Sequence, residues 1–109
     1  MDINNLDIAV KIAACVCGKD GVISQLEEEA IISNVILEYP NYSIIRFNRV
    51  IDEFFEEDQQ IEDYLLQISG LNLSDFTIKL CEISASSDGL DTKENIALDK
   101  VKIFLSEGL

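Results

Sequence analysis

The fold is decided by residues 11–30, which read KIAACVCGKDGVISQLEEEA. The first half of this stretch is apolar with helical spacing, and a break follows between Gly18 and Gly21. Ser24 then precedes a second helical stretch, and Glu27 stands three residues further on, which is the capping-box pattern of a helix start. These residues therefore predict a helix, an Asp-Gly turn and a second, capped helix.

The same pattern recurs at residues 79–97, which read KLCEISASSDGLDTKENIA. The Asp-Gly turn is repeated, and the second copy is one residue shorter beyond it. Glu94 then aligns with Glu27, and Ala97 aligns with Ala30. Agreement at the turn, at the helix start and on the apolar face is more specific than any one of them. The chain is thus predicted to contain two helix–loop–helix units that pack as a pseudo-symmetric pair.

We place the two units at about residues 6–38 and 74–107, bridged by helices at about 43–69. Asn72 or Ser74 is expected to cap the helix that opens the second unit. The first bridging helix has an amphipathic stripe formed by Ile44, Phe47, Ile51, Phe54 and Phe55. No stretch of useful length alternates with period two. The whole chain of 109 residues is therefore predicted to be one all-α domain, a bundle of about six helices.

Acidic residues dominate the charge, since 21 Asp and Glu against 8 Lys and Arg give a net charge of −13. Such a surface repels phosphate groups, so neither nucleic acid nor an anionic membrane is expected as a partner. Cations and basic protein surfaces are favoured instead. No apolar run approaches the roughly 20 residues that cross a bilayer, and the N-terminus lacks the features of a signal peptide. We therefore expect a cytoplasmic protein, with its three cysteines reduced and buried.

The residues of most catalytic sites are missing from this sequence. It contains no histidine, no glycine-rich phosphate loop and no Gly-x-Ser-x-Gly nucleophile turn. Pairs of carboxylates alone do not indicate a substrate cleft. We therefore expect a binding protein and not an enzyme.

The duplicated units resemble the tellurite-resistance TerB-like domains. The resemblance rests on Ala13-Ala14, on KDGVISQLEE at residues 19–28 and on ASSDGLDTKE at residues 85–94. This chain departs from the family pattern at Lys19 and Ser87, where alanine usually precedes Asp-Gly, and therefore resembles a divergent member. The resemblance implies an all-helical module that senses metal or acts as a scaffold in bacterial stress and phage-defence responses.

Acidic residues near the two loops are the metal ligands that the resemblance implies. They are Asp20, Glu27, Glu28, Asp88, Asp91 and Glu94. Oxygen ligands of this kind suit Ca²⁺ or Mg²⁺ better than zinc. Turn chemistry and helix capping offer a second explanation for the same residues, because Asp favours tight turns and acids stabilise helix starts.

A second acidic cluster lies in the bridging segment and contains no base. Its acids are Asp52, Glu53, Glu56, Glu57, Asp58, Glu62 and Asp63. Phe54, Phe55 and Tyr64 are interleaved with them. One interpretation is a solvated outer face whose aromatic rings turn inward. The other is a docking surface for a basic protein, on which the acids steer the encounter and an aromatic ring anchors it.

Two functions follow as hypotheses. The first is a TerB-like, non-catalytic interaction module of a stress or defence response that binds a divalent cation at its paired acidic loops. The alternative is an immunity or antitoxin-type protein that neutralises a basic toxin, for example a nuclease, through its acidic face. For both we expect a protein partner with a basic surface. A third possibility is a subunit that acts as a scaffold and binds no small ligand.

Overall fold

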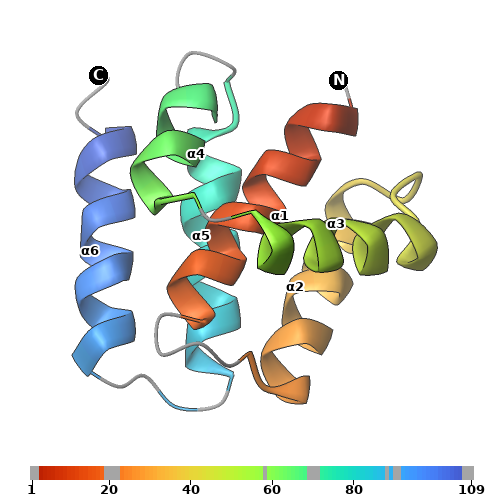
Figure 1. Ribbon diagram of the computed structural model, residues 1–109, viewed down its shortest axis with the longest axis horizontal. Helices are drawn as coiled ribbons and strands as arrows, with labels where there is room; N and C mark the ends of the chain where they lie inside the picture. Colours follow the sequence, from red (N-terminus) through yellow and green to blue (C-terminus); the bar gives the residue numbers. More distant parts are fainter. Residues whose placement is uncertain are drawn as a thin grey trace.

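The computed structural model describes residues 3–18, 23–57, 59–68, 72–87, 89 and 92–106. This part of the chain is helical and contains no β-strand, so the predicted all-α bundle is confirmed (Figure 1). Its six helices are α1 (Ile3–Cys17), α2 (Gln25–Glu38), α3 (Ile44–Glu56), α4 (Ile61–Ile68), α5 (Ser74–Ser86) and α6 (Thr92–Ser106).

Helix α1 is the centre of the bundle, as its apolar sequence predicts. Eight of its residues are buried, and it packs against each of the other five helices. Three of the buried residues are alanines, which allow neighbouring helices to approach closely. The burial of this helix on several sides explains why its sequence is apolar almost all round.

The four helices of the repeated units interlock across the middle of the molecule. In Figure 1, α1 and α5 run downward beside each other, and α2 and α6 return upward on opposite sides. Helix α2 packs on α5, and α6 packs on α1 as well as on α5. The second helix of each unit thus contacts the first helix of the other unit, so neither unit forms its core alone.

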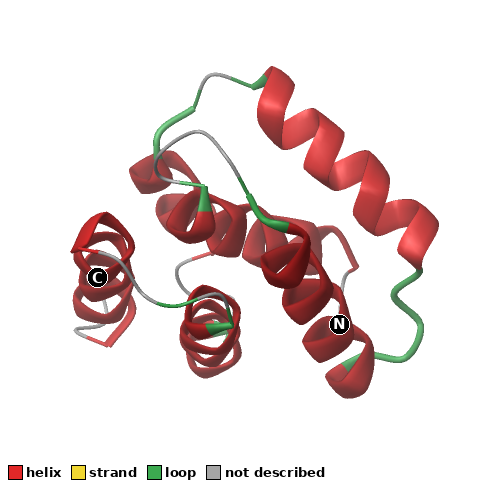
Figure 2. Cartoon of the chain, turned by 90° about the horizontal axis from the view of Figure 1, so that it is seen from below, coloured by secondary structure: helices red, strands yellow, loops and turns green. Residues whose placement is uncertain are grey.

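Helix α3 lies at the outside of the bundle and packs mainly on α1 (Figure 2). Its predicted stripe is only partly correct. Phe47 and Ile51 are buried and Phe54 packs against the core, but Ile44 is 59% exposed and Phe55 is 54% exposed. Among the described helices, α3 packs mainly on α1, so only a narrow part of its apolar surface is buried.

The start of α5 differs from the prediction. Leu73 occupies the N-cap position and makes no side-chain capping bond, whereas the sequence predicts Asn72 or Ser74 as the cap. Asn72 has a positive φ of 61° and lies one residue too early, and Ser74 is already helical. Leu73 is almost completely buried, so packing of this leucine determines where the helix begins.

Candidate functional site

The start of α2 is held by the capping box that the sequence predicts. The hydroxyl of Ser24 accepts a hydrogen bond from the Glu27 amide at 3.1 Å. One carboxylate oxygen of Glu27 accepts a hydrogen bond from the Ser24 amide at 2.9 Å. The Glu27 side chain is only 4% exposed, so this carboxylate is part of the interior.

The buried acids of the two units lie near one cysteine, Cys17 at the end of α1. Burial, above all, raises the pKa of this thiol. The charges of Glu27, Cys81 and Glu94 raise that pKa further, and the thiol also hydrogen-bonds to Glu27. Glu94, the counterpart of Glu27 in the second unit, is itself buried at 7% exposure. The tertiary fold thus brings the start of α2 and the start of α6 to the same region around Cys17.

The predicted metal ligands are only partly within the described residues. Asp20, Asp88 and Asp91 lie outside them, and Glu28 is half-buried near the start of α2. In the described part of the chain, no group of three or more Cys, Asp or Glu side chains is arranged to hold a metal ion. A cation at Glu27 would compete with the two hydrogen bonds that this side chain already makes. The cation site therefore stays a prediction from the resemblance.

Two acids of the second cluster pair with other side chains of the protein. Glu57 accepts hydrogen bonds from Lys11 Nζ at 3.0 Å and from the Tyr64 hydroxyl at 2.7 Å. Glu53 forms longer ion pairs, at 3.7 Å with Lys11 and at 3.9 Å with Arg49. These contacts fasten the end of α3 to α1 and α4. The positive charges of Lys11 and Arg49 partly balance the negative charges of Glu57 and Glu53.

Two further acids, both on α4, also have bonding partners. Glu62 pairs with Lys100 of α6 at 2.8 Å. Asp63 accepts a hydrogen bond from the Gln60 amide at 3.0 Å and thereby caps the first turn of α4. Asp58 lies outside the described residues. Most of the predicted docking acids that the structure describes thus have a structural partner.

Asp52 and Glu56 are different, because neither forms a hydrogen bond or ion pair within the described residues. They flank Phe55 on the solvent side of α3, three residues before it and one residue after it. Tyr64 is buried and Phe54 packs inward beside it, with ring centroids 6.3 Å apart. The interpretation in which all three aromatic rings turn inward is therefore wrong for Phe55.

Helical spacing extends this surface toward the start of α3. We define the α3 outer face as the exposed stripe Ile44, Asn48, Asp52, Phe55 and Glu56. On one helix it combines two exposed apolar side chains with two carboxylates that have no partner within the described residues. Exposed apolar side chains surrounded by charged ones are typical of protein-binding surfaces.

A polar network that no local sequence pattern indicates holds α3 in place. The guanidinium of Arg46 forms two bonds with the carboxylate of Asp7 on α1, at 2.9 and 2.6 Å. The hydroxyl of Tyr42 donates to the same carboxylate at 2.8 Å. An Arg–carboxylate pair with two bonds is both strong and directional. It fixes the orientation of α3 and therefore which side of that helix faces solvent.

Comparison of the chain with known protein families, with curated proteins and with solved structures finds no match. Among the described residues, no helix is long and apolar enough to cross a membrane.

Proposed function

We propose that this protein is a non-catalytic interaction module that binds a basic protein surface through the α3 outer face. One observation carries the proposal: Phe55 is 54% exposed between two carboxylates that have no partner of their own in the described residues. Exposing a phenylalanine costs stability unless another surface covers it, because about 25 cal/mol is lost for each Å² of apolar area left in water. A partner that covers Phe55 would recover that energy.

The charge of the chain supports a basic partner. The net charge of −13 attracts positively charged proteins from a distance, within the limits set by salt screening. Asp52 and Glu56 are available to pair with lysine or arginine at the end of that approach. The acids thus favour the encounter, and the phenylalanine supplies contact area after it.

The class of module is a proposal as well. The duplicated unit supports a divergent TerB-like domain, with a cation at its acidic loops as part of that proposal. Asp52 and Glu56, which have no partner within the described residues, equally support the alternative, an inhibitor that neutralises a basic toxin. Both functions use the same face, and they differ in the protein that binds there. Gene order separates them: an adjacent toxin gene favours the inhibitor, and a tellurite-type or defence cluster favours the module.

Affinity capture from an extract of the source cells tests the proposal. The wild-type chain, Phe55→Ala and the double variant Asp52→Lys, Glu56→Lys serve as baits. Leu66→Ala is the matched control, because it removes another exposed apolar side chain from α4. We expect a basic protein that the wild type and the control capture and that both face variants lose. Equal capture by all four baits would contradict the proposal, and a captured nuclease inhibited by the chain would identify the inhibitor function.

A further inference from the structure

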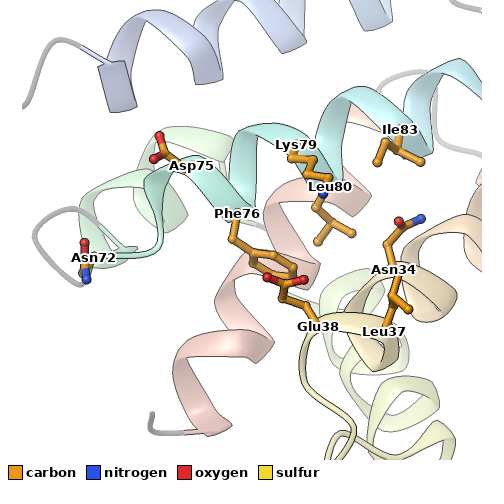
Figure 3. A pocket seen from close by; sticks show the side chains of 9 residues that line it. All are labelled: Asn34, Leu37, Glu38, Asn72, Asp75, Phe76, Lys79, Leu80 and Ile83. Carbon is orange, nitrogen blue, oxygen red and sulfur yellow. The ribbon is translucent and has the colours of Figure 1, made fainter.

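The side of the bundle away from α3 carries a groove between α2 and α5 that the proposed function does not use. Its volume is about 310 Å³ (Figure 3). Phe76 and Leu80 of α5 line it together with Leu37 of α2 and Ile83 of α5. The residues that line it come from α2, from α5 and from the segment before α5, and none belongs to the α3 outer face.

The groove offers apolar surface that no other part of the described chain covers. Leu37 is 78% exposed and Ile83 is also exposed, whereas Leu80 is buried. Phe76, Leu80 and Ile83 follow one another at helical spacing, so the apolar surface continues along about two turns of α5. A groove of this length between two helices is the geometry in which amphipathic helices dock.

A second hollow, of about 370 Å³, continues the groove past the end of α2. Glu38 lines both hollows. Phe76 of the first hollow and Tyr39 of the second meet edge to face, with ring centroids 5.1 Å apart. An occupant that spans both hollows must therefore pass over a carboxylate and an aromatic pair.

The charged side chains around the groove indicate which kind of ligand it favours. Glu38 and Asp75 are exposed, and neither has a hydrogen-bond or ion-pair partner within the described residues. Lys79 lies on α5 one turn after Asp75, on the wall across from Glu38. Asn34 bonds to the Ala30 carbonyl of its own helix at 2.7 Å and does not bridge the groove. A basic side chain is favoured at Glu38, where a carboxylate and aromatic rings both attract a cation.

We propose that this groove binds an amphipathic helix of a partner protein that carries a lysine or arginine between two apolar side chains. The base pairs with Glu38 over the aromatic pair. One apolar side chain, a turn before the base, enters the hollow beside Leu37 and Ile83. The other, a turn after the base, enters the hollow beside Tyr39 and Pro40. The chain then has two docking sites, the α3 outer face and the groove between α2 and α5.

The test uses a helix-stabilised synthetic peptide with Leu, Arg and Leu spaced four residues apart on one face. Fluorescence anisotropy measures its affinity for the full chain, and NMR shift changes show where it binds. We expect shifts confined to the α2–α5 groove and the adjoining hollow. Replacing the arginine of the peptide by glutamate should weaken binding about tenfold, since attraction at Glu38 becomes repulsion.

Variants of the chain complete the test. Glu38→Lys should weaken binding of the arginine peptide about tenfold, and Leu37→Ala about fivefold. Glu29→Lys, on the opposite face of α2, and Leu66→Ala, on α4, are the matched controls and should bind like the wild type. Phe55→Ala should also bind normally, so failure here is distinguishable from failure of the proposed function.

Three results would overturn the inference. The first is no binding of the peptide at millimolar concentration, and the second is equal binding of the arginine and glutamate peptides. The third is self-association of the chain that Leu37→Ala abolishes, because a second copy would then be the occupant.

Discussion

Neighbouring acids of the acidic cluster differ in whether they bond to other side chains of the protein. Glu57 and Glu56 are neighbours in the chain, yet only Glu57 bonds to the interior. The Tyr64 hydroxyl is the main cause that holds the pKa of Glu57 below its ordinary value of 4.5. Lys11 lowers that pKa further, and burial acts in the opposite direction. Glu57 therefore stabilises the fold, whereas Glu56 is available to a partner.

Substitution at Glu57 makes this difference measurable. Because the pKa of Glu57 is lower in the folded state, its carboxylate stabilises the fold above pH 4.5 and loses this effect as the pH falls through the folded pKa. We expect Glu57→Gln to lower the free energy of unfolding by about 1 kcal/mol at neutral pH, with a smaller difference below pH 4.5. Urea unfolding at several pH values measures it. Glu56→Gln is the control, and an equal loss there would contradict the assignment.

The cysteines provide a second test at the residue scale. Burial raises the pKa of Cys17 and of Cys81, so the reactive thiolate is scarce at both positions. We expect iodoacetamide to leave both thiols unmodified in the folded protein and to modify them in concentrated urea. Mass spectrometry of the peptides measures this. Rapid labelling of Cys17 or Cys81 without denaturant would show that α1 and α5 do not pack as described.

Among the elements, α3 depends most on a polar contact, because it packs mainly on one helix. Replacing Arg46 by Ala leaves the partly buried carboxylate of Asp7 without its cation. We expect a loss of about 2 kcal/mol in the free energy of unfolding and faster hydrogen exchange in α3. Arg49→Ala is the matched control, since Arg49 is exposed and makes only a 3.9 Å pair with Glu53. Equal effects of the two substitutions would contradict the claim that the Arg46–Asp7 pair holds α3 on α1.

The loops that join α1 to α2 and α5 to α6 carry the cation prediction. If Asp20, Asp88 and Asp91 hold Ca²⁺ or Mg²⁺ with the glutamates, the ion should raise the melting temperature and release or absorb heat on titration. Calorimetry at millimolar ion tests this, and alanine substitution of the three aspartates should abolish the effect. No heat and no thermal shift in the wild type would remove the cation from the proposal.

At the scale of the whole molecule, the sequence predicts what depends on local periodicity. The helical class, the central position of α1 and the capping box at Ser24 and Glu27 all follow from residues close together in the chain. Helical spacing alone does not show that Phe54 turns inward and Phe55 outward, because both belong to one apolar stripe. The position of α3 on α1 decides between them.

The features that the sequence does not predict depend on contacts between segments far apart in the chain. Arg46 and Asp7 are far apart in the sequence, and no local pattern marks them as partners. The same holds for the pair of Lys11 and Glu57 and for the groove between α2 and α5. The sequence locates the acidic cluster, but only tertiary contacts show which of its acids have a partner within the described residues and which do not.

The role of the α3 outer face is tested most directly by binding kinetics with the captured basic protein. Surface plasmon resonance compares the wild-type chain with the double variant Asp52→Lys, Glu56→Lys at low and at high salt. We predict that the variant associates about tenfold more slowly at low salt and that its association rate depends less on salt, because the steering charges are reversed. Association rates that are unchanged at both salt concentrations would contradict the proposal that the partner binds at this face.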